Sequence, residues 1–122
     1  MPFCSIKIGK EIEDLVSSYL QQRGLKLVEV NYRCKVGEID LIMNDNEILV
    51  FVEVRYRKDS DYGGGLATVT KYKQNKIKRA ATLYLLENNI YDKVPCRFDV
   101  VAVSGRLHKK INWVKDAFWI KW

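Results

Sequence analysis

Two short stretches decide the fold: Gly37-Glu38-Ile39-Asp40-Leu41-Ile42 and, after a polar turn, Val50-Phe51-Val52-Glu53-Val54-Arg55. Both are rich in β-branched and apolar residues, which predicts two neighbouring strands. Acidic side chains are costly in such surroundings unless they are paired or bind a metal. One carboxylate on the first strand, with a carboxylate and a cation two residues apart on the second, suits a divalent ion beside a phosphate. The pattern therefore favours a metal-dependent nuclease.

The alternation of side chains along a strand places Glu53 and Arg55 on one face. A two-residue loop at Asp45-Asn46 is the commonest connection for such a hairpin, and it sets Asp40 opposite Phe51. Opposed residues point to the same face, so Asp40 shares the face of Glu53 and Arg55. The two carboxylates become diagonal neighbours, roughly 7–8 Å apart at the backbone, and can converge on one ion. A slip of one residue would move Asp40 to the other face.

Length and composition predict one soluble globular domain over residues 1–122. Hydrophobic residues make up 48% of the chain and charged residues 30%, which excludes a disordered chain. No apolar stretch is long enough to span a membrane, and the first residues lack a signal peptide, so we expect no membrane partner. The three widely spaced cysteines support neither a disulfide framework nor a zinc site, and they favour the cytoplasm.

The charge of the chain points to a polyanionic partner without proving one. The formal net charge is +6 and the sequence pI is near 9.2. Basic proteins are attracted to nucleic acid, although many of them bind nothing in particular.

The order of the elements predicts an α/β domain with a mixed sheet flanked by helices. Apolar residues at helical spacing alternate in the chain with runs that have the two-residue period of strands. The glycine-rich residues 57–66 are expected to form a flexible loop directly after the candidate site. The remaining predicted elements are helices over 9–23 and 70–88 and strands over 25–34, 97–103 and 107–114.

The chain resembles the YraN-like family along nearly its whole length. These are small bacterial proteins with a restriction-endonuclease-like fold, related to archaeal Holliday-junction resolvases. The resemblance implies that fold for this chain. It rests on the two stretches above and on further segments in the same order: 9–20 with Glu13, Val69-Thr70, Lys73-Gln74, Arg79-Ala80-Ala81, Arg97-Phe98-Asp99-Val100-Val101 and Asp116-Ala117-Phe118.

The resemblance implies an endonuclease that acts on DNA, with branched or structured DNA as a substrate by analogy with the resolvases. Asp40 and Glu53 would ligate Mg²⁺ or Mn²⁺, with Glu13 adding a carboxylate from the first helix. The family's usual catalytic lysine corresponds to Arg55, which stays protonated and cannot act as a general base, although it can stabilise phosphate charge. Asp40, Glu53 and Arg55 are therefore the candidate catalytic residues. Ile39 is a second departure, because many related nucleases have proline there.

Each acid also has a purely structural interpretation. Glu38 shares the predicted face of Asp40, and the sequence does not decide whether it is a ligand or a neighbour of the ligands. The structural interpretations are an ion pair of Glu53 with Arg55 at a solvated edge, a turn cap or an ion pair with Lys35 for Asp40, and the positive helix N-terminus for Glu13.

A basic stretch on the second predicted helix is the other candidate site. A lysine-rich helix surface is usually only solvated. Here it follows the glycine-rich loop beside the carboxylates, which favours contact with phosphates. His108, on a basic turn, is expected at the surface. The predicted nucleic-acid-binding residues are Arg55, Arg57, Lys71, Lys73 and Lys76, and the C-terminal aromatics Trp113, Phe118, Trp119 and Trp122 favour packing or a homodimer contact.

Three functions are consistent with these features. The first is a metal-dependent DNA endonuclease. The second is a nucleic-acid-binding module that keeps the nuclease fold without efficient catalysis. The third is an adaptor whose basic surface contacts another protein. The three acids favour the first function, whereas Arg55 in place of lysine favours the second.

Overall fold

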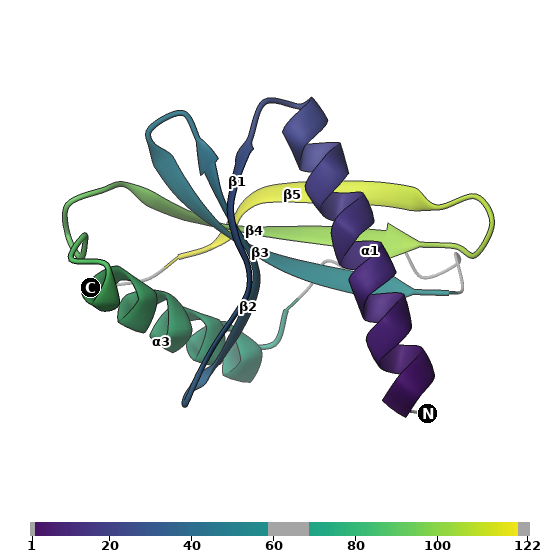
Figure 1. Cartoon of the computed structure of the whole chain (residues 1–122), viewed down its shortest axis with the longest axis horizontal. Helices are drawn as coiled ribbons and strands as arrows, with labels where there is room; N and C mark the ends of the chain where they lie inside the picture. The colour runs from purple at the N-terminus through teal and green to yellow at the C-terminus, as the bar shows by residue number, and fades with distance from the viewer. Residues whose placement is uncertain (1, 59–68, 120–122) are drawn as a thin grey trace.

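The computed structural model describes residues 2–58 and 69–119, with side chains from residue 9 onward. In these ranges five strands form one mixed sheet and two helices pack against it (Figure 1). The predicted α/β class, a mixed sheet flanked by helices, is confirmed. The elements are α1 (Pro2–Gln22), β1 (Lys26–Cys34), β2 (Gly37–Asp45), β3 (Ile48–Arg57), α3 (Lys71–Glu87), β4 (Cys96–Ser104) and β5 (Lys110–Phe118).

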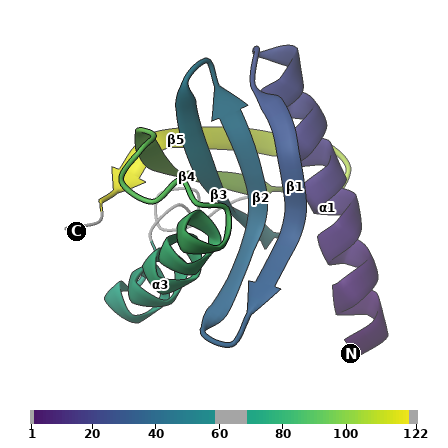
Figure 2. The same ribbon diagram turned by 60° about the vertical axis from the view of Figure 1, so that its left-hand side comes forward.

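The sheet has the order β1-β2-β3-β4-β5, so β3 is its central strand. The first three strands are antiparallel neighbours joined by short turns. Strand β4 runs parallel to β3, because the chain between them crosses over through α3, as parallel pairing requires. Strand β5 then returns antiparallel to β4. Figures 1 and 2 show β1 and β2 running steeply across the direction of β3, β4 and β5, so the sheet is strongly twisted.

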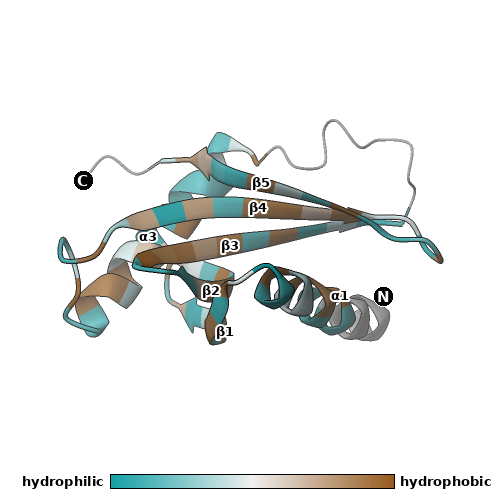
Figure 3. Cartoon of the chain, turned by 90° about the horizontal axis from the view of Figure 1, so that it is seen from above, coloured by the Kyte–Doolittle hydropathy of each residue, from teal (hydrophilic) through white to brown (hydrophobic). Residues whose placement is uncertain are grey.

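Each helix covers its own face of the sheet. On α1, Ile12, Val16 and Leu20 recur every four residues and pack with alternate strand residues such as Val50. On the other face, α3 contributes a separate core cluster with the remaining strand residues, among them Phe51. The hydrophobic residues along β3 stand out in Figure 3. Neither described helix is long and apolar enough to cross a membrane.

The loop between β2 and β3 differs from the prediction by one residue. Asp45 pairs with Ile48, so the two loop residues are Asn46 and Glu47, and Asn46 takes the left-handed conformation with φ 58°. Asparagine tolerates that conformation better than most residues. Moving a two-residue loop by one position shifts the pairing by two residues. The predicted pairing of Asp40 with Phe51 was therefore wrong, but every side chain keeps its predicted face.

Two further boundaries differ from the predictions. Helix α1 begins at Pro2 rather than at residue 9, which agrees with the tolerance of proline in the first turn of a helix. The turn after β4 extends to residue 109, with His108 exposed as predicted, so β5 covers residues 110–118 instead of 107–114. Most of the glycine-rich loop predicted for residues 57–66 lies outside the described residues.

A fully buried carboxylate, Asp99, ties β4 to β5. It accepts two hydrogen bonds from Arg97 (2.9 and 3.0 Å) and one from the Trp113 indole N–H (2.9 Å). It also accepts one from the backbone N–H of Asp116 (2.9 Å). Asp116 has a positive φ of 55° and lies where the pairing of β4 with β5 shifts register. Arg97 also donates a hydrogen bond from Nη1 to the carboxylate of Asp45 at the end of β2 (2.9 Å). This network fixes the end of the sheet opposite the turn after β4.

Asp99→Ala is expected to lower the free energy of unfolding by about 3–5 kcal/mol, because it leaves the half-buried Arg97 without its main partner. Urea unfolding measures the loss. The matched control is Asp14→Ala, whose exposed ion pair with Lys10 predicts a change below about 1 kcal/mol. Equal losses in the two variants would contradict the role assigned to Asp99.

Candidate functional site

The site lies where β2 separates from β3. The last paired residues of the two strands are Leu41 and Val52, whereas β2 stays paired with β1 as far as Gly37. Beyond that point the backbone N–H of Val54 donates to Oδ2 of Asp40 at 2.8 Å. A carboxylate oxygen thus takes the place of a carbonyl of the neighbouring strand. The side chain of Asp40 is held between the two strands.

This arrangement brings Asp40 and Glu53 together, as the sequence predicts. Asp40 is 9% exposed and Glu53 is 7% exposed. Burial, followed by the charge of Asp40, raises the pKa of Glu53 from its ordinary value of 4.5 to about 8. Burial also raises the pKa of Asp40, but the Val54 N–H opposes that rise. Burial and the neighbouring carboxylate therefore favour the protonated form of Glu53, which can donate a hydrogen bond to Asp40.

The cation beside this carboxyl pair comes from helix α3. Thr70 caps the helix by accepting a hydrogen bond from the backbone N–H of Lys73 (3.1 Å). The Nζ of Lys73 lies 3.7 Å from Oε2 of Glu53, and Lys73 is the stronger of the two cations that lower the pKa of Glu53, the other being Arg55. Glu53 is buried on the central strand, so it does not lie at a solvated edge, although the charge of Arg55 acts on it as the structural alternative expects.

Glu13 lies near the carboxyl pair without completing a set of metal ligands. It is half-buried on α1, and its pKa is raised by burial and by the charge of Asp40, while a hydrogen bond from Asn31 opposes the rise. Glu38 is exposed, and its charge raises the pKa of both Glu13 and Asp40. No group of three or more His, Cys, Asp or Glu side chains in the described parts of the chain is arranged to hold a metal ion. The role of Glu13 as a third metal ligand stays a prediction, with its carboxyl group beside Asp40.

The donor chemistry nevertheless fits Mg²⁺ or Mn²⁺. The site offers carboxylate oxygens, which are the hard ligands that these ions prefer. Mg²⁺ usually binds through one or two carboxylates and completes its coordination with water and substrate phosphates. Asp40 and Glu53 can supply that number of ligands once the proton leaves Glu53.

The predicted basic residues do not form one surface. On α3, Lys73 faces Glu53, whereas Lys71 lines a groove on another side of the helix. The ammonium of Lys76 lies 5.3 Å from the ring of Tyr72. Arg57 is exposed at the end of β3. Lys73 and Arg55 both add positive charge beside the carboxyl pair, since each lowers the pKa of Glu53.

Comparisons with known proteins give a consistent family. The family model described as "Uncharacterised protein family UPF0102" matches residues 12–103. A UPF0102 protein of Legionella pneumophila is 49% identical over 110 residues, which is 90% of this chain and 92% of the relative. One from Pseudomonas syringae is 45% identical over 112 residues (90% and 91%), and one from Coxiella burnetii is 43% identical over 116 residues (95% of each chain).

The raised pKa of Glu53 predicts how the stability of the metal-free protein depends on pH. The native state binds a proton more tightly than the unfolded state, so the stabilisation is complete below pH 4.5 and is lost as the pH rises towards about 8. Glu53→Gln should remove most of this decline and raise the free energy of unfolding above pH 8, on the order of 2 kcal/mol or more. Urea unfolding in EDTA at several pH values measures both effects.

The control is Glu47→Gln in the exposed β2–β3 turn, which should follow the wild-type curve. If Glu53→Gln also follows that curve, the carboxyl pair does not carry the proton assigned to it.

Proposed function

Because the chain belongs to the uncharacterised protein family UPF0102, the family of the YraN-like proteins that it resembles, and the family name assigns no activity, we propose a function from the geometry. The protein is a metal-dependent endonuclease that acts on DNA, including branched or structured DNA. The observation that carries the proposal is the pair of buried carboxyl groups, Asp40 and Glu53, which lie close enough for the charge of Asp40 to raise the pKa of Glu53. Strongly perturbed carboxyl groups of this kind are typical of functional sites.

Asp40 and Glu53 would hold the ion from the two strands where these separate. Asp40 is oriented by the Val54 N–H, and Glu53 becomes a ligand by losing its proton. A bound Mg²⁺ or Mn²⁺ would polarise the scissile phosphodiester and lower the pKa of an attacking water. Glu13, next to Asp40, can accept a hydrogen bond from such a water.

Lys73 is the residue best placed to do what Arg55 cannot. Its ammonium is beside Glu53 and half exposed, so it can orient a water or contact a phosphate. Arg55 remains a fixed positive charge on β3 that stabilises negative charge on the phosphate. In this proposal Lys73 orients the water and Arg55 stabilises the phosphate charge, two roles that the family resemblance assigns to a single lysine.

The metal site is tested by titration calorimetry with Mn²⁺. We expect one site whose affinity increases between pH 6 and pH 8, because the ion must displace the proton of Glu53. Asp40→Asn and Glu53→Gln should each weaken binding at least 10-fold.

Glu47→Gln is again the control and should bind as the wild type does. Equal affinity in the wild type, Asp40→Asn and Glu53→Gln would place any bound metal elsewhere.

Catalysis is tested with labelled linear duplex, single-stranded and four-way-junction DNA in Mg²⁺ or Mn²⁺. At saturating DNA, Lys73→Ala and Arg55→Ala should each lower the cleavage rate on the order of 10²-fold, as expected when transition-state charge stabilisation is removed. Arg55→Lys should retain or increase cleavage. The charge-matched control is Lys26→Ala, at an exposed position on β1, which should cleave normally.

The alternative function is a nucleic-acid-binding module without catalysis. One observation favours it: arginine stands at the lysine position. This alternative predicts DNA binding that is unchanged by EDTA and no cleavage of any substrate, either by the wild type or by Arg55→Lys.

A further inference from the structure

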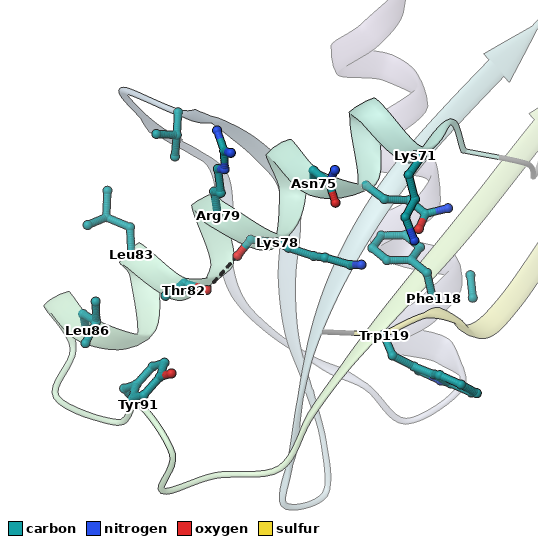
Figure 4. A pocket seen from close by; sticks show the side chains of 13 residues that line it. Lys71, Asn75, Lys78, Arg79, Thr82, Leu83, Leu86, Tyr91, Phe118 and Trp119 are labelled. Atoms are coloured by element: carbon teal, nitrogen blue, oxygen red, sulfur yellow. Dashed lines mark hydrogen bonds between the residues drawn. The ribbon is translucent and has the colours of Figure 1, made fainter. Parts of the chain in front are cut away.

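A groove of about 1100 Å³ runs along α3 to the end of β5, and the carboxyl pair does not line it (Figure 4). Three of its lining side chains are the cations Lys71, Lys78 and Arg79. Among the described residues that line it, none is Asp or Glu. In Figure 4 the side chains of Lys71 and Lys78 extend towards Phe118 and Trp119. The groove is therefore positively charged at its β5 end.

The described lining of the groove holds no acidic side chain to neutralise its cations. Desolvation lowers the pKa of Lys78, and the charge of Lys71 lowers it further. The Nζ of Lys78 lies 6.0 Å from the centre of the Phe118 ring, at the outer limit of a cation–π contact. Cations that repel one another beside an apolar wall would gain from binding an anion.

An exposed aromatic side chain stands beside these cations. Trp119 is 70% exposed directly after β5, whereas Phe118 is buried and packs on Phe98. Trp113 on the same strand is held by its hydrogen bond to Asp99. Trp119 thus offers an indole face to a planar ligand. The exposed amide of Asn75 lies further along the groove and can bond to a base edge.

We propose that this groove binds a single strand of nucleic acid, with Lys71 and Lys78 on the phosphates and Trp119 stacked on an unpaired base. Proteins that bind single strands combine a positively charged groove with aromatic side chains. A duplex keeps its base faces stacked and inaccessible, so the exposed indole selects an unpaired strand. The inference rests on the proposed function in taking nucleic acid as the substrate, and it adds that an unpaired segment is part of that substrate.

The charges disfavour the two other occupants of such a groove. A second copy of this chain carries the same net charge of +6, so its approach to three cations would be opposed by repulsion. An apolar segment of another protein would bury those cations without a partner, which is costly. A single strand offers phosphates to the cations and unpaired bases to the indole.

The test is fluorescence anisotropy with a labelled oligothymidine of about 15 nucleotides and a duplex of the same length, both in EDTA. The wild type should bind the single strand more tightly. Trp119→Ala should weaken binding of the oligothymidine on the order of 10-fold and affect the duplex little. Lys78→Ala should weaken binding of the oligothymidine and flatten its salt dependence by about one unit.

The control variants are Lys110→Ala, at the opposite end of β5, and Leu107→Ala, in the exposed turn before it. Both should bind the oligothymidine as the wild type does. Circular dichroism of Trp119→Ala checks the fold, which should persist because the side chain is mostly exposed.

Wild-type affinity for oligothymidine in both Trp119→Ala and Lys78→Ala would overturn the proposal for the groove. A wild-type dimer that becomes a monomer in Trp119→Ala, measured by sedimentation, would also overturn it and make the groove an interface between copies. If the groove variants bind normally while the wild type cleaves DNA, only the groove proposal fails. A wild-type protein that binds neither probe and cleaves nothing overturns the proposed function as well.

Discussion

The hydrogen bond from the Val54 N–H to Asp40 is the contact on which the candidate site depends. It forms because the pairing of β2 with β3 stops at Leu41 and Val52, whereas β2 stays paired with β1 as far as Gly37. A backbone N–H exposed by that separation must find an acceptor, and the Asp40 carboxylate supplies it. The same bond holds Asp40 beside Glu53. The separation of β2 from β3 and the position of the carboxyl pair are therefore linked through this hydrogen bond.

The buried carboxyl pair lowers the stability of the folded protein, and a bound cation would reduce this loss. Two buried acids side by side favour the protonated form, as the pKa of Glu53 near 8 indicates. The rest of the molecule can tolerate this cost because both faces of the sheet are covered by apolar clusters and because Asp99 ties β4 to β5. Local destabilisation of this kind, compensated elsewhere in the fold, is typical of functional sites.

The sequence predicted the class of fold and the convergence of Asp40 with Glu53, because strand alternation is insensitive to a shift of two residues. It missed the loop at Asn46-Glu47, since a left-handed asparagine can occupy either loop position. It could not identify the Val54 N–H, because backbone groups leave no signal in side-chain patterns. The partnership of Lys73 with Glu53 depends on how α3 is rotated against β3, and the exposure of Trp119 depends on where β5 ends. Both are properties of packing.

The most direct test of the metal site is a crystal structure of the protein soaked in Mn²⁺ at pH 8 and measured for anomalous scattering. The proposed site predicts one strong anomalous peak within bonding distance of both Asp40 and Glu53, and its loss in crystals of Glu53→Gln. An ordered carboxyl pair with no peak beside it at saturating Mn²⁺ would contradict the central claim.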